Sequence, residues 1–228
     1  MEKVVENTYR DINIAFANEL ALISGRLGID VMEVIDVANS QPFCNILRPG
    51  AGVGGHCIPM DPYYLIDEAK KIGLDVQLLE NSRKINDYMP QHVVELVEDG
   101  LKGINKNISK SKIALLGVSY KENTDDYRYS PSRDIINYLN KKNAYINTYD
   151  PFVEDVPDLK VEHFNDLKEC VKDVDCIIIA TAHNEFKEMD LDEIKSLTND
   201  NCLFVDGRCS FNPDDVINSG YVYKVIGR

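Results

Sequence analysis

The sequence predicts an α/β protein in which an all-helical domain precedes a doubly wound domain built on a parallel sheet. Two observations predict this class. Before residue 103 the apolar residues follow helical spacing, whereas from residue 112 short apolar segments alternate with helical patterns, as in βαβ units. The stretch between them, KGINKNISK, is polar and aperiodic. We therefore place the domain boundary there and predict a helical domain over 1–103 and an α/β domain over 110–228.

The first predicted helix spans residues 3–27 and is apolar nearly all round in the stretch INIAFANELALI. Such a helix needs cover on several sides. Either a subunit interface or the buried centre of a monomer would provide this cover, and composition does not distinguish between these two alternatives. Gly25 and Gly28 end the helix.

Asp30 is the predicted N-cap of a short helix that runs to Ala38. A long loop rich in Gly and Pro follows over 39–61, and loops of this length inside a compact domain are usually functional. Asp61 then reads as an N-cap before Pro62. Glycines and prolines bound the remaining helices of this domain, which we place at 61–73, 76–88 and 90–102, with Pro90 at a kink or a fresh start.

Four short apolar segments predict buried strands, at 112–117, 145–150, 175–182 and 202–207. Ser130 and Pro131 open a helix between the first two strands. Further helices are expected near 166–172 and 190–197. Strands that alternate with helices in this way predict a parallel sheet.

Composition narrows the class of protein. The chain has 228 residues and a net charge of −13, which argues against a general nucleic-acid binder or a binder of anionic membranes. No apolar run is long enough to span a membrane, and the polar N-terminus does not resemble a signal peptide. Six cysteines without a C-x-x-C pair fit reduced thiols in a cytoplasmic protein. We predict no metal site.

The segment PGAGVGGHCIPMDP (49–62) matches G-x-G-x-x-G, the fingerprint of dinucleotide binding. That fingerprint needs a strand before the glycines and a helix after them. Pro49 precedes the glycines, and the two prolines that follow Gly55 forbid a helix there. We therefore interpret the segment as a loop that holds a reactive thiol, that of Cys57, with a buried structural cysteine as the alternative.

Two further groups of polar residues are candidates. Lys3, Asn7 and Arg10 have the spacing of one helix face, which lines either a ligand cleft or solvent. Cationic residues also follow two predicted strands, where open parallel sheets bind their ligands. These cationic residues are Lys121, Arg128 and Arg208. Together with the N-terminus of the helix at Ser130, they predict an anion site, preferably for phosphate. The alternative is that they are ordinary surface charges.

Five ordered motifs resemble the UDP-glucose/UDP-N-acetylmannosamine dehydrogenase family: KVVENTYRDINIAFANEL, GVGGHCIPMDPYYL, ENSRKINDYMP, LLGVSYKENTDDYRYSP and FVDGR. The form GGHCIP resembles the UDP-N-acetylhexosamine branch, because the UDP-glucose branch usually lacks this His and carries Lys where Met60 stands. The family consists of an NAD-binding Rossmann domain, a helical dimerisation domain and a Rossmann-like UDP-binding domain. The resemblance therefore implies a chain without the NAD-binding domain, inactive alone, and a homodimer formed through the first long helix.

The resemblance also implies a reaction and its residues. The family oxidises the sugar C6 alcohol to a carboxylate with two NAD. Cys57 matches the nucleophile, which passes through a thiohemiacetal and a thioester. Lys3 matches the lysine that stabilises the oxyanion, and Asn7 matches the residue that orients the same oxygen. Asp61 matches the carboxylate that positions water. The remaining matches are contacts: Lys3, Asn7, Arg10, Gly54, Lys121 and Arg208 for the substrate, and Arg128 for the NAD phosphates.

One segment departs from the family. Where this branch commonly has His-Pro-Arg, the chain has Gln41-Pro42-Phe43. Phe43 cannot bind an anion, which puts the sugar contact of this loop in doubt. The resemblance implies UDP-N-acetylmannosamine as the substrate, and UDP-N-acetylglucosamine and UDP-glucose are the alternatives. A non-catalytic UDP-sugar-binding or dimerisation module is the alternative from another functional class.

Overall fold

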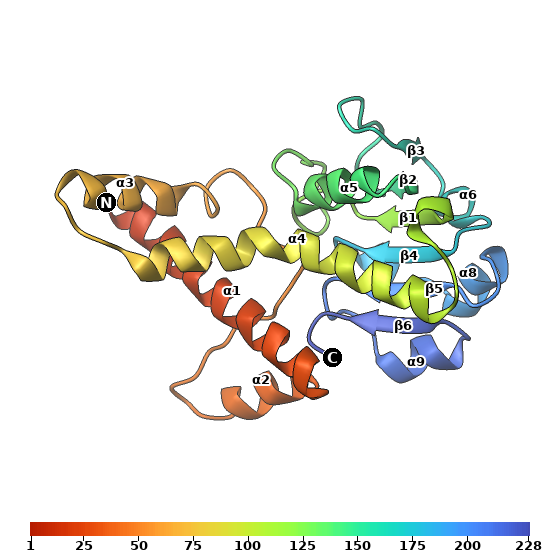
Figure 1. Ribbon diagram of the computed structural model, residues 1–228, viewed down its shortest axis with the longest axis horizontal. Helices are drawn as coiled ribbons and strands as arrows, with labels where there is room; N and C mark the ends of the chain where they lie inside the picture. The colour runs from red at the N-terminus through yellow and green to blue at the C-terminus, as the bar shows by residue number, and fades with distance from the viewer.

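Helices alone form the first part of the computed structural model, which describes residues 1–228. They are α1 (Glu2–Leu27), α2 (Val31–Asn39), α3 (Asp61–Lys71) and α4 (Gln77–Gly103). Helices α1 and α4 cross, and α3 packs against α1 at the end of the molecule far from the sheet (Figure 1). No helix or strand forms between α2 and α3, as predicted.

Local sequence explains the ends of these helices. Gly28 adopts a left-handed conformation, with a φ of 67°, and ends α1. The carboxylate of Asp30 accepts a hydrogen bond from the backbone N–H of Met32 and caps α2, as predicted. The expectation for Asp61 was wrong: it is the first residue of α3, and Met60 takes the N-cap position without a side-chain bond.

The prediction of two helices, at 76–88 and 90–102, was wrong, because no new helix starts at Pro90. Pro90 lies buried inside α4, which continues through it to Gly103. An internal proline costs a helix about 3 kcal/mol. The buried apolar residues on both sides of Pro90 offset this cost, because they pack into one core with the sheet.

The second part is a sheet of six parallel strands: β1 (Lys112–Leu116), β2 (Tyr145–Tyr149), β3 (Glu162–Phe164), β4 (Cys176–Ile179), β5 (Leu203–Asp206) and β6 (Val222–Val225). The order β3-β2-β1-β4-β5-β6 confirms the doubly wound fold. The order reverses between β1 and β4. The edge strands β3 and β6 were not predicted.

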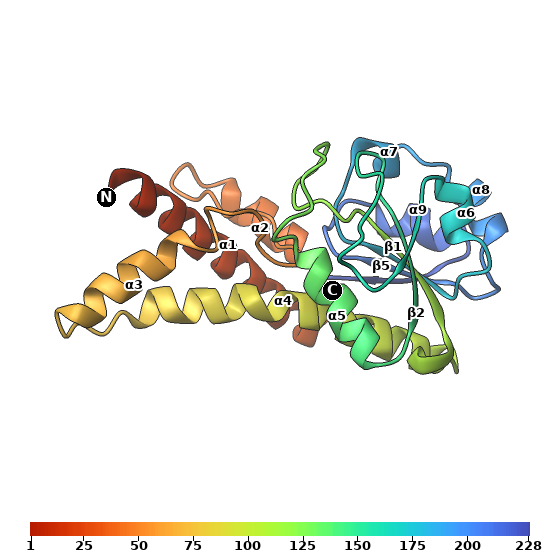
Figure 2. The ribbon, with the colours of Figure 1, turned by 90° about the horizontal axis from the view of Figure 1, so that it is seen from above.

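Helices cover both faces of this sheet (Figure 2). On one face lie α4 and α5 (Pro131–Lys141), and on the other lie α6 (Leu167–Val171), α7 (Asn184–Lys187), α8 (Leu191–Leu197) and α9 (Pro213–Asn218). A 3-10 turn at Ile108–Lys110 occupies the polar stretch before β1. Helix α4 shares one hydrophobic core with the sheet, so packing does not separate the two parts at residues 103–110. The domain boundary there stays a prediction. None of the helices combines the length and apolar character that crossing a membrane requires.

The contact of α4 with the sheet can be tested at two glycines near the end of this helix. A Cβ on Gly100 would lie 2.5 Å from Cδ1 of Leu203, whereas a Cβ on Gly103 would meet nothing within 4 Å. We expect Gly100→Ala to destabilise the protein by about 1–3 kcal/mol through overpacking. The control, Gly103→Ala, should be neutral or stabilise by about 0.5–1 kcal/mol. Thermal unfolding measures both, and a Gly100→Ala protein as stable as the control would contradict this packing.

Candidate functional site

The glycine-rich loop presses against the carboxyl edge of the sheet. A Cβ on Gly54 would lie 2.8 Å from both Cδ of Pro131 and Cβ of Tyr120, and a Cβ on Gly50 would lie 2.6 Å from Nη1 of Arg208. The loop follows no strand, and turns rather than a helix follow the glycines. The glycines therefore allow close approach of two parts of the chain, and the interpretation against a dinucleotide fingerprint is confirmed.

Cys57 lies exposed at the start of the turn that leads into α3. Its carbonyl accepts hydrogen bonds from the backbone N–H groups of Met60 (3.1 Å) and Asp61 (2.8 Å). The side chain of Asp61 in turn accepts a hydrogen bond of 2.5 Å from Nδ2 of Asn7. Asn7 is buried in α1, so two hydrogen bonds connect three of the predicted site residues across α1, the loop and α3.

The other two residues of the predicted polar face stay in solvent. Lys3 and Arg10 are exposed on α1, one turn to either side of Asn7. The ammonium group of Lys3 forms an ion pair with Glu6 at 3.0 Å. The structure thus brings Asn7 to Asp61 but gives Lys3 and Arg10 no hydrogen bond or ion pair to the loop.

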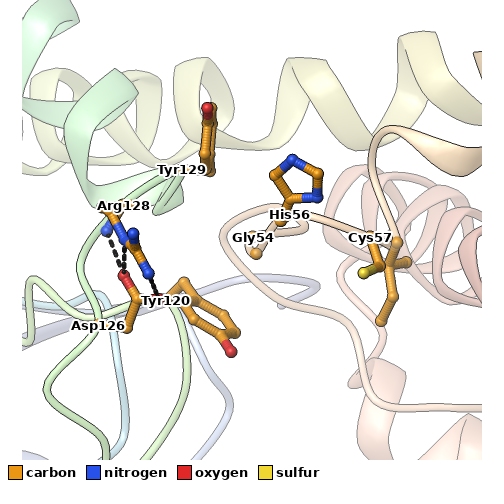
Figure 3. Close-up of a pocket in the computed structure, with 9 residues that line it drawn as sticks. Gly54, His56, Cys57, Tyr120, Asp126, Arg128 and Tyr129 are labelled. Atoms are coloured by element: carbon orange, nitrogen blue, oxygen red, sulfur yellow. Dashed lines mark hydrogen bonds and ion pairs between the residues drawn. The ribbon is translucent and has the colours of Figure 1, made fainter.

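A cavity of about 460 Å³ opens beside Cys57, between the glycine loop and the loop that follows β1 (Figure 3). Its lining comes from both loops: Gly54, Gly55, His56, Cys57 and Ile58 from one, and Tyr120, Asp126, Arg128 and Tyr129 from the other. The Arg128 guanidinium donates two hydrogen bonds of 2.9 Å to Asp126, which lower the pKa of that carboxyl. The sequence predicted Arg128 as a ligand contact, but it did not identify Tyr120, Asp126 or Tyr129 as site residues.

Tyr129 joins the two loops. Its carbonyl accepts a hydrogen bond of 3.2 Å from the N–H of Gly55, and its ring meets the His56 ring edge-on at 5.8 Å. Its φ of 55° is unusual for a bulky residue. Tyr120 and Tyr129 are isolated in a loop, so no periodic pattern marks them as site residues. Their place in the motif LLGVSYKENTDDYRYSP was the only sequence feature that could have pointed to them.

The two remaining cations lie at strand ends, as predicted, but outside this cavity. Lys121 is exposed in the loop after β1, and Arg208 is half-buried after β5, with its guanidinium against Gly50. Neither forms an ion pair with a carboxylate, so both charges are free to meet an anion. The side chain of Ser130 accepts a hydrogen bond from the N–H of Ser132 and caps α5, which confirms the predicted helix start.

The departure Gln41-Pro42-Phe43 lies in the loop after α2. Phe43 is 98% exposed, and Gln41 and Pro42 are exposed too. A phenylalanine in solvent contributes nothing to the core, so the residue is free to meet a ligand or another chain.

Comparison with known proteins gives one family. Residues 1–88 match the central domain of the UDP-glucose/GDP-mannose dehydrogenase family, and residues 114–213 match its UDP-binding domain. A UDP-N-acetyl-D-mannosamine dehydrogenase from Methanococcus vannielii is 38% identical over 100% of this chain and 51% of its own length. An NDP-N-acetyl-D-galactosaminuronic acid dehydrogenase from Ralstonia solanacearum is 34% identical over 86% of this chain and 45% of its own.

Solved structures of dehydrogenases from the same family resemble this chain in fold. The UDP-D-ManNAc dehydrogenase from Pyrococcus horikoshii has a TM-score of 0.89 at 37% identity, over 99% of this chain and 50% of that one. The NDP-N-acetyl-D-galactosaminuronic acid dehydrogenase from Methanosarcina mazei has a TM-score of 0.93 at 35% identity, over 100% of this chain and 50% of that one. The chain thus spans about half the length of these relatives. With its two matched segments and five ordered motifs, it belongs to the UDP-glucose/GDP-mannose dehydrogenase family, of which it carries the central and UDP-binding domains.

Proposed function

We propose that this chain is the thiol-bearing and UDP-binding part of an NAD-dependent UDP-N-acetyl-D-mannosamine 6-dehydrogenase. The observation that carries the proposal is the hydrogen-bonded set of Cys57, Asp61 and Asn7, of which Cys57 lines the cavity between the glycine loop and the loop after β1. The names of several relatives, such as those from Methanococcus vannielii and Pyrococcus horikoshii, support this substrate.

The proposed reaction runs through Cys57. NAD, when bound, accepts one hydride from C6 in each of two oxidations. After the first, the Cys57 sulfur bonds to the aldehyde carbon and the carbonyl oxygen takes up the proton, which gives a thiohemiacetal on the protein. Loss of the second hydride and of that proton leaves a thioester. Water then adds to its carbonyl carbon, the carbon–sulfur bond breaks, and the acid leaves with the thiol restored.

The neighbours of Cys57 have distinct roles in this proposal. Asp61 orients the attacking water and takes its proton, because it follows Cys57 by one turn of the chain, with its backbone N–H bonded to the Cys57 carbonyl. Asn7 holds that carboxylate and offers an N–H to the oxyanion. Lys3 has to leave Glu6 to bring its charge to the oxyanion, and an exposed ion pair of this kind contributes little that would prevent it.

The residues present fit only one edge of an NAD site. Arg128 is exposed and lines the cavity beside Cys57, where its guanidinium can meet a phosphate. The glycine loop has no strand–turn–helix context that would bind a pyrophosphate. We therefore expect the 228-residue chain by itself to reduce no NAD with any UDP-sugar.

Lys121 and Arg208 are the proposed ligands of the UDP diphosphate, since both lie at the carboxyl edge of the sheet without a carboxylate partner. Arg10 and Gly54 are proposed substrate contacts. The exposed Phe43 at the family's arginine position favours a change in how the sugar is held. UDP-N-acetylglucosamine and UDP-glucose therefore stay as alternative substrates, and a non-catalytic UDP-sugar-binding module stays as the alternative function.

We also propose a homodimer through α1. Five apolar side chains of this helix are about half or more exposed, and their spacing places them along one stripe: Val5, Tyr9, Phe16, Ile23 and Leu27. A stripe of this length on a soluble protein indicates a partner, and an identical stripe on a second copy is a fitting one.

The cysteines test whether Cys57 lies in the substrate site. Cys44 and Cys57 are exposed, whereas burial raises the pKa of Cys170, Cys202 and Cys209 to about 12 and raises the pKa of Cys176 well above its usual value. Iodoacetamide at neutral pH should therefore modify Cys44 and Cys57 first, because the thiolate is the reactive form. A saturating UDP-sugar should slow the modification of Cys57 at least about fivefold and leave Cys44 as the internal control, as peptide mass spectrometry would measure. Equal protection of both, or of neither, would contradict the proposed site.

Thermal unfolding tests the UDP ligands. UDP at 100 times its Kd should stabilise the protein by about 2.7 kcal/mol, which raises Tm by several degrees for a chain of this size. Lys121→Ala and Arg208→Ala should each shrink this shift. The matched control is Lys110→Ala, since Lys110 is exposed before β1 at the opposite edge of the sheet. A shift that survives both substitutions, or an equal shift with NAD alone, would mean that this edge binds another ligand.

Light scattering tests the dimer. Phe16→Glu should convert a dimer to a monomer at micromolar concentration. It should change the free energy of unfolding of the monomer by no more than about 0.5 kcal/mol, because Phe16 is 49% exposed on α1. Ile217→Glu, at a residue 52% exposed on α9, is the control that should leave the dimer intact. A wild-type chain that is monomeric under these conditions would refute the α1 interface.

A further inference from the structure

A fully buried histidine connects three loops at the carboxyl edge of the sheet. His183 lies in the loop after β4, at the point where the strand order reverses. Its ring reaches Asp150 after β2 and both Ser119 and Asn123 after β1. The proposed mechanism uses neither His183 nor Asp150.

The hydrogen bonds define the protonation of this ring. The backbone N–H of Asn123 donates to Nδ1 at 2.8 Å, so Nδ1 carries no proton and Nε2 does. Nε2 donates to the Asp150 carboxylate at 3.0 Å, and this oxygen also accepts the N–H groups of Val118 and Ser119. Burial acts to raise the pKa of Asp150, but these hydrogen bonds lower it overall, so the carboxylate stays charged and holds the ring in place.

The same turn carries Lys121. The Lys121 carbonyl accepts hydrogen bonds from the hydroxyls of Ser119 (3.0 Å) and Thr124 (2.9 Å). Asn123 adopts a φ of 57°, and its side-chain oxygen accepts the N–H of Asn184, next to His183. The backbone of the turn is therefore fixed from both sides, while the ammonium group of Lys121 projects into solvent without a partner.

We propose that His183 is a positioning residue for Lys121, and that UDP affinity depends on this ring through Lys121 alone. The inference rests on the proposed function, in which Lys121 binds the diphosphate. A flexible lysine side chain binds an anion more tightly when its backbone is already in place, because less conformational freedom is lost on binding.

A double-mutant cycle on UDP binding, measured by calorimetry on the full chain, tests this inference. Lys121→Ala should weaken binding about tenfold or more through loss of a charged hydrogen bond. His183→Phe keeps a flat aromatic ring but removes both ring nitrogens, and it should weaken binding about as much. In the Lys121→Ala background, His183→Phe should change Kd less than about twofold, because its effect passes through a residue that is no longer there.

His163→Phe is the matched control. His163 also uses both ring nitrogens, toward Thr148 and Val153, but it lies on the edge strand β3 and does not touch the Lys121 turn. Its loss should lower stability and leave Kd within about twofold. If His183→Phe does not fold, His183→Gln replaces it, because a glutamine can donate to Asp150 but offers Asn123 no acceptor at Nδ1.

The outcomes are distinct. An unchanged Kd in the foldable His183 variant, or an equal loss in both backgrounds, would overturn the positioning role and leave the proposed function intact. A wild-type chain that does not bind UDP, or a Lys121→Ala variant that binds it normally, would overturn the proposed function and this inference with it. The expected pattern, with a loss only while Lys121 is present, supports both.

Discussion

The close approach of the glycine loop to the carboxyl edge of the sheet is the constraint on which the site depends. A side chain at Gly54 would overlap Pro131 and Tyr120, and one at Gly50 would overlap the Arg208 guanidinium. The loop is thus seated on the start of α5 and on the loops after β1 and β5. This contact forms the cavity in Figure 3, which Cys57 and Arg128 both line.

Buried polar bonds fix the other side of this loop to the helices. The N–H of Gly50 donates to Asn18 of α1, and Asn18 donates to Asn86 of α4. Asn86 in turn donates to Asp11, which also accepts a bond from Arg83. All four side chains are buried, so the loss of one partner would leave others unsatisfied at about 1–3 kcal/mol each. The helices therefore hold the loop against the sheet, and α4 joins the two parts through a shared core.

The sequence predicted the elements that tertiary packing reinforces. The four central strands are short, largely buried segments, and their predicted bounds lie within three residues of those in the structure. The edge strands β3 and β6 are short and partly exposed, so they lack that signal. At Pro90, a local rule failed because burial of the surrounding helix outweighed a lost hydrogen bond. Loop composition, helix spacing and strand ends predicted most of the candidate site residues, and motif resemblance supplied their roles. The bond from Asn7 to Asp61 and the contact of Tyr129 with the glycine loop join segments that are distant in the sequence, and residue spacing does not encode such contacts.

The most direct test of this account is a crystal structure of the chain with UDP-N-acetylmannosamine. If one substrate spans the cations of the sheet edge and the thiol of the loop, the diphosphate should lie between Lys121 and Arg208, and the sugar C6 should be directed toward the sulfur of Cys57. A nucleotide bound elsewhere, such as at the opposite edge of the sheet beside Lys112 and Tyr145, or a sugar directed away from Cys57, would contradict it.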